Sequence, residues 1–169
     1  MSTITVDPNR KRRPILIITR GLPASGKSTA AIAWVNADPD WRARMNRDDL
    51  RSMAHGRWLG TPSQEAIVSG AQHAGVRTAL SHGTSVIVDD TNLYTRDVTL
   101  FEKIAAEMEA DFEIWDFRGA PLQRCIDWDA QRDVHDRVGE EVIRAKYNKH
   151  IAPGVANDTI ATTRVMVNG

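Results

Sequence analysis

The segment from Gly21 to Ser28 carries the clearest chemical signal in the sequence. It reads GLPASGKS and satisfies the pattern G-x-x-x-x-G-K-[ST] in full. In this pattern backbone N–H groups cradle phosphates, the lysine bridges the β- and γ-phosphates, and the final hydroxyl takes one position on Mg²⁺. The sequence therefore predicts a site for ATP or another nucleoside triphosphate, with Ser28 on the Mg²⁺. The residues predicted to bind its phosphates are Gly21, Pro23, Ala24, Ser25, Gly26, Lys27, Ser28 and Thr29.

A second polar segment, Asn46 to Arg51, begins about 20 residues after Lys27. A kinase with an alcohol acceptor needs a carboxylate near the hydroxyl, to take its proton and orient it in line with the γ-phosphorus. Asp48 or Asp49 can serve, and Arg51 lies about one helical turn further on, where it can hold an anion. The alternative, which the residues leave open, is a helix N-cap aspartate with exposed charges at the helix end.

Two carboxylates follow a short apolar run, Ser85 to Val88, in the sequence Asp89-Asp90-Thr91-Asn92. This is the Walker-B pattern, in which an acid at the end of a buried strand helps to place the metal ion or its waters. Asp90 is therefore a candidate for binding Mg²⁺ through a water molecule. The alternative is ordinary turn chemistry, which these residue types also favour.

A charged segment from Arg124 to Arg137 contains two candidate lid arginines, Arg132 and Arg137. A mobile arginine that closes over the phosphates can neutralise the charge that develops during transfer and exclude water. Because aspartates are interleaved with these arginines, a plain solvated helix surface is the competing interpretation.

The elements that must position these residues follow from hydrophobic periodicity. Strand-length apolar runs alternate with stretches of helical spacing, which predicts an α/β protein with a parallel sheet. The expected strands are Pro14 to Thr19, Trp41 to Met45, Ser85 to Val88, Phe112 to Phe117 and Thr163 to Val167. The expected helices run from the phosphate loop to about Asn36, from Asp49 to about His55, from Ser63 to Leu80, from Thr95 to Glu109, from Pro121 to about Arg132, and from Glu140 to His150.

Length and composition favour one globular domain. The chain has 169 residues, and its 22 basic and 22 acidic side chains cancel, which argues against a surface that coats duplex DNA. No apolar run approaches the roughly 20 residues that span a bilayer, and the single Cys125 cannot form an intrachain disulfide. We expect a cytoplasmic protein with a flexible basic tail over residues 1–13, a single domain over residues 14–169, no membrane contact and no zinc site.

Taken together and in this order, these segments resemble the kinase domain of phage polynucleotide 5′-hydroxyl kinases, from Ile15 to His150. The matching stretches are GLPASGKST, NRDDLRSMAHG, IVSGAQ, VDDTNL and VGEEVIRAKYNKH. The resemblance implies a three-layer P-loop kinase fold, in which helices flank a parallel sheet and a small helical lid covers one end. The chain departs from the family at Trp128, where a basic residue is common in the family. The chain also lacks the family's D-x-D-G-T phosphatase motif.

The resemblance also implies roles for individual residues. Asp48 would be the general base, Arg51 would grip the phosphate of the acceptor nucleotide, and Lys27 would act on the donor. Arg132 aligns with the catalytic lid arginine, with Arg137 as its rival because one residue is inserted before Val138. The acceptor site would comprise Asp48, Arg51, Asp90, Thr91 and Asn92.

The sequence thus predicts an Mg²⁺-dependent enzyme that transfers the γ-phosphate of ATP to the 5′-hydroxyl end of DNA or RNA. A separate phosphatase or ligase partner is compatible with the missing phosphatase motif, as is an oligomer, and a phage-encoded chain would work in the host cytoplasm. The nearest alternative is a P-loop kinase of a small alcohol, such as a sugar, nucleoside or antibiotic. A nucleotide-binding switch without transfer is less favoured, because Asp48 has no use beside bound ATP unless a hydroxyl loses its proton.

Overall fold

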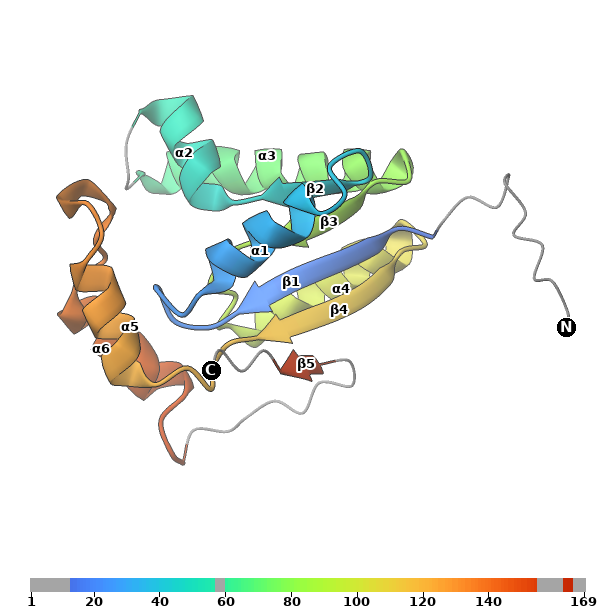
Figure 1. Cartoon of the computed structure of the whole chain (residues 1–169). Helices are drawn as coiled ribbons and strands as arrows, with labels where there is room; N and C mark the ends of the chain where they lie inside the picture. The colour runs from blue at the N-terminus through green and yellow to red at the C-terminus, as the bar shows by residue number, and fades with distance from the viewer. Residues whose placement is uncertain (1–12, 57–59, 155–162, 166–169) are drawn as a thin grey trace, which may run out of the picture.

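A parallel sheet forms the centre of the molecule (Figure 1). The computed structural model describes residues 13–56, 60–154 and 163–165. Five strands pair in the order β2-β3-β1-β4-β5, and every neighbouring pair is parallel. All strands therefore end at one edge of the sheet, where open α/β sheets bind their ligands. The strands are β1 (Ile15–Arg20), β2 (Arg42–Met45), β3 (Ser85–Val88), β4 (Asp111–Asp116) and β5 (Thr163–Val165).

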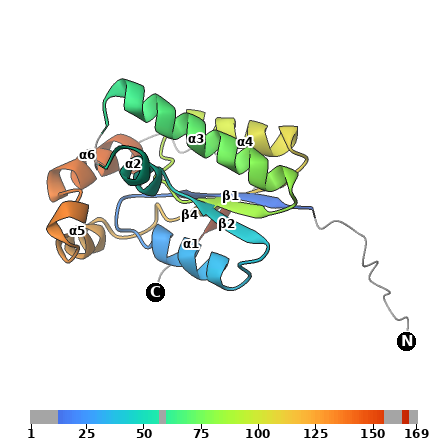
Figure 2. The same cartoon turned by 90° about the horizontal axis from the view of Figure 1, so that it is seen from above.

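Helices cover both faces of the sheet, which confirms the predicted three-layer fold. Figure 2 shows α1 (Lys27–Asn36) on one face and α3 (Pro62–Ser81) and α4 (Thr95–Glu107) on the other. The remaining elements are α2 (Arg47–His55), α5 (Leu122–Ala130), the 3₁₀-helix η1 (Val134–Asp136) and α6 (Glu140–His150). In Figure 1, α2 and the α5–α6 pair lie beyond the carboxyl ends of the strands, with the ends of β1 and β3 between them.

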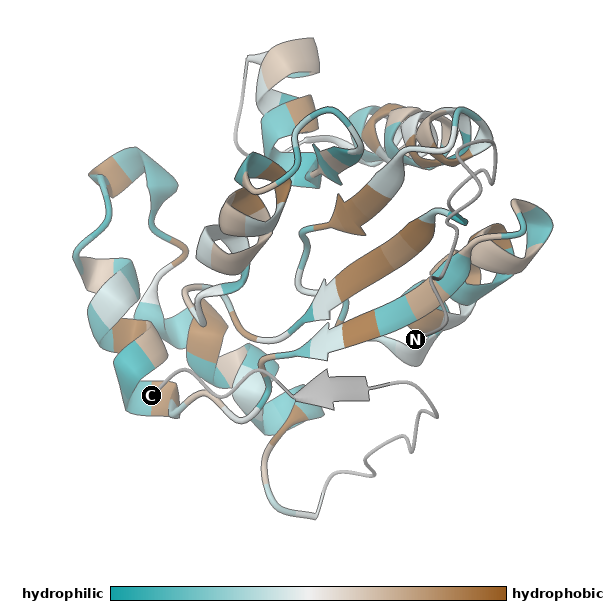
Figure 3. Ribbon diagram, turned by 45° about the vertical axis from the view of Figure 1, so that its right-hand side comes forward, coloured by the Kyte–Doolittle hydropathy of each residue, from teal (hydrophilic) through white to brown (hydrophobic). Residues whose placement is uncertain are grey.

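The apolar runs form strands because both of their faces are covered. On β1, Leu16 and Ile18 point into the core with α3 and α4, whereas Ile17 packs with Ala31 of α1. These side chains are at most 1% exposed. A strand that is buried on both sides reads as a continuous apolar run rather than an alternating one, and Figure 3 shows β1 and β3 as the most hydrophobic part of the ribbon.

The helical lid consists of α5, η1 and α6. It is attached to the rest of the fold by a cluster of apolar side chains from the phosphate loop, the β3–α4 loop, α5 and α6: Leu22, Leu93, Cys125, Ile126 and Ile143. Within the lid, the buried Asp129 at the end of α5 accepts hydrogen bonds from the backbone N–H groups of Val138 (3.1 Å) and Gly139 (2.8 Å). The Asp129 carboxylate therefore fixes the start of α6 against the end of α5.

The predicted elements are confirmed within a few residues. The helix and strand at 140–150 and 85–88 have the predicted bounds, whereas α5 ends at Ala130 and a 3₁₀ turn replaces part of the predicted connection. The predicted basic tail lies outside the described residues, apart from Arg13. That side chain donates to the Glu109 carbonyl (2.8 Å) and pairs with Asp111 (3.2 Å), so it belongs to the fold.

Candidate functional site

The phosphate loop joins β1 to α1 and has the backbone conformations that turn N–H groups inward. Ala24 and Gly26 both have positive φ, at 57° and 95°, a combination that can bend successive N–H groups toward an anion. Gly21 is required for a different reason, since a Cβ there would lie 2.9 Å from Cβ of Phe117. The Gly21 N–H donates to the Thr91 carbonyl (3.0 Å), which ties the loop to the end of β3.

A pocket opens in front of this loop, and seven residues from the loop and the lid line it: Ala24, Gly26, Lys27, Ser28, Thr29, Trp128 and Arg132. Gly21, Pro23 and Ser25, the other predicted phosphate ligands, are buried behind it. The pocket thus combines the start of a helix, which favours anions, with a lysine and a lid arginine.

The surroundings of Lys27 make its positive charge unfavourable in the free protein. Its side chain is 6% exposed, and Nζ donates to the Leu22 carbonyl (2.5 Å). Burial lowers the pKa of Lys27 to about 8, although the carboxylates of Asp89 and Asp90 act in the opposite direction. The buried ammonium lacks a fully compensating anion in the free protein, and a triphosphate would supply one.

The first prediction follows from this pKa. A triphosphate binds the charged form of Lys27 better, so the affinity for ATP is expected to fall as the pH rises above about 8, by up to roughly tenfold per pH unit. Isothermal titration calorimetry between pH 7 and pH 10 measures it. In a Lys27→Arg variant the guanidinium does not titrate in this range, so its ATP affinity should be flat. An equal slope in that variant would assign the titration to another group.

The start of α2 shows which residue caps the helix. The N-cap residue is Asn46, whose side chain accepts from the Asp49 N–H (2.9 Å). Neither Asp48 nor Asp49 therefore caps the helix. The side chain of Asp48 is 49% exposed at the carboxyl edge of the sheet. Asp49 is 68% exposed and pairs with Arg44 instead. Of the two, Asp48 belongs to a network with other predicted site residues.

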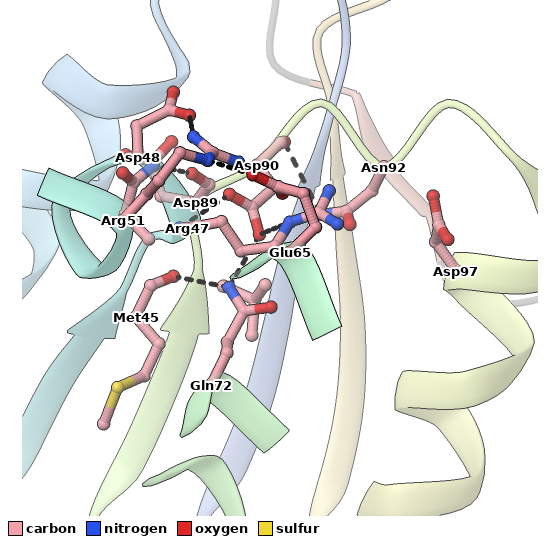
Figure 4. Close-up of polar contacts among 12 residues, drawn as sticks. Met45, Arg47, Asp48, Arg51, Glu65, Gln72, Asp89, Asp90, Asn92 and Asp97 are labelled. Atoms are coloured by element: carbon pink, nitrogen blue, oxygen red, sulfur yellow. Dashed lines mark hydrogen bonds and ion pairs between the residues drawn. The ribbon is translucent and has the colours of Figure 1, made fainter. Parts of the chain in front are cut away.

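Arg51 connects Asp48 to a residue that the sequence patterns did not reveal. Its Nη1 donates to Asp48 Oδ1 (2.6 Å), while Nε and Nη2 donate to the two carboxylate oxygens of Glu65 (2.5 and 2.8 Å). The hydrogen bonds that Arg51 donates to Glu65 raise the pKa of Arg51 and lower the pKa of Glu65. Arg51 is thus a fully charged bridge that fixes Asp48, and Figure 4 shows this chain of contacts.

The two carboxylates at the end of β3 differ in their surroundings. Asp90 is enclosed: it accepts from the Arg47 N–H (3.1 Å) and Gln72 Nε2 (2.6 Å), and burial raises its pKa. The side chain of Asp89 is fully buried and pairs through Oδ2 with Arg44 (2.7 Å). Its Oδ1 has no hydrogen-bond partner within the described part of the chain. An unpaired buried oxygen of this kind is suited to a ligand or a metal-bound water.

The rest of the β3–α4 loop is bonded to β1 and to the phosphate loop. Asn92 has φ of 40° and is 1% exposed, and its amide donates to the Thr19 carbonyl (2.8 Å). Asn92 therefore holds the loop against β1, and its contact with the acceptor stays a prediction. Thr91 is half-buried, and its carbonyl accepts from Gly21. Both residues fix the distance between the phosphate loop and Asp90.

The lid arginines occupy different positions. Arg132 lines the pocket and lies 3.6 Å from Asp129, and its charge contributes to the low pKa of Lys27. Arg137 is exposed, and its Nε donates to the Arg132 carbonyl (2.8 Å). The geometry therefore favours Arg132 as the arginine for the donor phosphates, with Arg137 holding its backbone.

A second prediction separates these two arginines. Arg132→Ala is expected to lower the rate of phosphoryl transfer by about 10- to 100-fold while changing ATP affinity less, because a lid arginine acts mainly on developing charge. Arg137→Ala should stay within about twofold of the wild type, since its contact is a single exposed hydrogen bond. Single-turnover rates and equilibrium ATP binding measure the two effects. A larger loss with Arg137→Ala would exchange the assignments.

The sequence patterns predicted no site role for three residues that the structure places in or beside the site: Glu65, Gln72 and Asp129. Both Glu65 and Gln72 lie on α3. Glu65 reaches the site because α3 packs beside α2, and Gln72 because α3 also packs against β2 and β3. Asp129 reads as one of several surface acids but is 2% exposed. The capping box of Thr61 and Gln64 marks the start of α3, and it was the local signal that could have placed Glu65 in a defined first turn.

A family model described as an AAA domain matches residues 16–152. The L-seryl-tRNA(Sec) kinase of Methanococcus maripaludis is 30% identical over 146 residues, which cover 83% of this chain and 54% of that protein. A chain in the structure of the Pnkp1/Rnl/Hen1 RNA repair complex superposes with a TM-score of 0.71 at 28% identity, over 85% of this chain and 46% of that one. The chain thus spans about half the length of these two relatives.

A third similarity concerns the fold alone. The APS kinase CysC of Mycobacterium tuberculosis, in complex with AMPPNP and APS, superposes with a TM-score of 0.62 at 18% identity, over 93% of this chain and 91% of that one. In the described ranges, no helix combines the length and the apolar character that crossing a membrane requires.

Proposed function

Because the chain belongs to the AAA domain family of P-loop kinase folds, we propose that it transfers the γ-phosphate of ATP to a hydroxyl carried by a polynucleotide, with the 5′-hydroxyl end as the acceptor. The observation that carries this proposal is the Asp48–Arg51–Glu65 network at the carboxyl edge of the sheet. A half-exposed carboxylate that a charged arginine holds in place, at the edge of the sheet that also carries the phosphate loop, can take the proton of an acceptor hydroxyl.

Electrostatic contacts relate the two halves of this site. The charge of Asp90 acts to raise the pKa of Lys27, and the charge of Asp48 acts to raise the pKa of Asp90. In the proposed reaction Lys27 and Arg132 hold the donor phosphates, and Asp48 accepts the proton of the acceptor hydroxyl. The hydroxyl oxygen bonds to the γ-phosphorus as the bond from that phosphorus to the β,γ-bridging oxygen breaks, and ADP leaves. The remaining N–H groups of Arg51 are available to an acceptor phosphate beside Asp48.

The residues present also fit Mg²⁺. Ser28 lines the donor pocket at the start of α1, and the unpaired Oδ1 of Asp89 is a buried acceptor for a metal-bound water. Asp90 keeps the same candidate role, although its two oxygens already have protein partners. The ion would supply charge neutralisation on the β- and γ-phosphates.

Relatives support the acceptor class. Two of the relatives with more than 25% identity bear names that concern RNA: one is an L-seryl-tRNA(Sec) kinase, and the other belongs to an RNA repair complex. RNA is common to the two names, which supports an acceptor hydroxyl carried by a nucleic acid. The first of them favours a second candidate function, the phosphorylation of an aminoacyl hydroxyl on a tRNA.

One experiment tests both functions. The protein is incubated with γ-labelled ATP, Mg²⁺ and a panel of acceptors: 5′-hydroxyl RNA and DNA oligonucleotides, seryl-tRNA, and small alcohols. Label on the oligonucleotide 5′ end is the expected result. Label on the aminoacyl group alone would select the second candidate, and label on small alcohols alone would contradict both.

A further inference from the structure

A hollow lies between Tyr94, at the start of α4, and α6. It is lined by Tyr94, Val142, Ala145, Lys146, Lys149 and His150, with Glu141 as the acidic member. Tyr94 is the N-cap residue of α4, at the end of the same loop that carries Asp90. The preceding Leu93 packs into the apolar cluster that attaches the lid to the rest of the fold.

Cations surround the Tyr94 ring. The guanidinium carbon of Arg96 lies 4.6 Å from the ring centroid, and Lys149 Nζ lies 5.1 Å from the centroid and 3.2 Å from the phenolic oxygen. The hydrogen bond from Lys149, together with the charges of Lys146 and Arg96, lowers the pKa of Tyr94. The His150 ring meets Tyr94 edge-on, with 4.6 Å between centroids.

Acidic groups offset this charge only in part. Arg96 lies 3.8 Å from Asp97, and Glu141 borders the hollow. Lys149 donates its hydrogen bond to Tyr94, and no ion pair joins Lys149 to another described residue. Tyr94 itself is exposed. An exposed ring with an apolar floor and a basic rim is the combination that single-stranded nucleic acids recognise, since bases stack and phosphates pair with cations.

We propose that this hollow binds a nucleotide of the acceptor strand, downstream of its 5′ end, with the base against Tyr94 and the backbone phosphates on Lys146, Lys149 and Arg96. The inference rests on the proposed function and narrows it, because the substrate becomes a single strand rather than a nucleoside or a small alcohol. An acidic peptide would pair with the cations but would not stack on the exposed part of the Tyr94 ring.

Direct binding tests the hollow independently of catalysis. Fluorescence anisotropy with a 3′-labelled, 5′-hydroxyl oligonucleotide of about 12 nucleotides gives the dissociation constant for each variant. Tyr94→Ala is expected to weaken binding by about fivefold or more, the loss of one stacked base, whereas Tyr94→Phe keeps the ring and should stay within about twofold of the wild type. Trp41→Ala removes an exposed aromatic side chain at the opposite end of the sheet and is the matched control.

Salt dependence tests the cations. For single strands the slope of log K against log salt changes by about 0.7 for each phosphate contact. Lys146→Ala and Lys149→Ala should each reduce the slope by about this amount, and Lys103→Ala, an exposed lysine further along α4, should not. A merely structural role for Lys149 would not alter the slope.

The results that overturn the proposal are distinct from those that overturn the kinase function. If Tyr94→Ala and Lys149→Ala leave the oligonucleotide affinity and its salt slope unchanged, the hollow does not bind the strand. The proposed transfer to the 5′ end would not be contradicted by that result. A Tyr94→Phe variant as weak as Tyr94→Ala would show that the phenolic contact matters and that no base stacks there. If the wild type transfers no phosphate to oligonucleotides yet binds them in a Tyr94-dependent way, the hollow stands and the 5′-kinase function fails.

Discussion

Phosphoryl transfer to every acceptor is expected to fall by about 10²- to 10³-fold when Lys27 is replaced by alanine. The ammonium group is buried at the phosphate loop, in a pocket that also holds Ser28 and Arg132. A charge that is already positioned and partly dehydrated acts strongly on the transferring phosphate, because little water screens it and no reorganisation is needed.

The same variant should keep its fold. Burial lowers the pKa of Lys27, so its charge costs stability in the free protein below about pH 8, and this cost shrinks as the pH rises toward 10.5. Lys27→Ala removes that cost, and its melting temperature near pH 7 should equal or exceed that of the wild type. Thermal denaturation by circular dichroism checks this, and γ-labelled ATP checks transfer. Near-normal turnover in a folded Lys27→Ala protein would exclude the donor site proposed above.

The second large effect is expected from Asp48→Asn. The amide oxygen can still accept the hydrogen bond from Arg51 Nη1, and Arg51 keeps both of its bonds to Glu65. The arrangement should therefore survive while the basicity is lost. Transfer to a 5′-hydroxyl oligonucleotide should fall by about 10²-fold or more, a typical contribution of a general base. ATP affinity should be nearly unchanged, because Asp48 lies outside the residues that line the donor pocket.

Asp49→Asn is the matched control for this experiment. It makes the same chemical change one residue further along α2, at a side chain that is 68% exposed and pairs with Arg44. Exposed ion pairs contribute little, so this variant should remain within a few-fold of the wild type. Wild-type transfer rates in Asp48→Asn, measured by single turnover with saturating ATP, would leave the start of α2 without a catalytic role.

The fold and the donor half of the site follow from local sequence. The run ILIIT forms a strand, and the glycine pattern after it forms a phosphate loop, through short-range preferences that neighbouring residues can express alone. The stretches at 85–88 and 140–150 were predicted with their observed bounds for the same reason. Asp48 was identified from its position after a strand, where the topology of a parallel sheet places ligands.

Tertiary structure decided the rest, because the deciding contacts join residues that are distant in sequence. Arg51 meets Glu65 across 14 positions, and this depends on α2 packing beside α3. The preference for Arg132 over Arg137 depends on the orientation of the lid, which the buried Asp129 fixes through the backbone N–H groups of Val138 and Gly139, just before α6. Tyr94 and Lys149 are 55 residues apart, and only the packing of α6 against the start of α4 makes them one surface. Side-chain pairs of this kind leave no periodic trace in a sequence, since each partner alone is compatible with solvent.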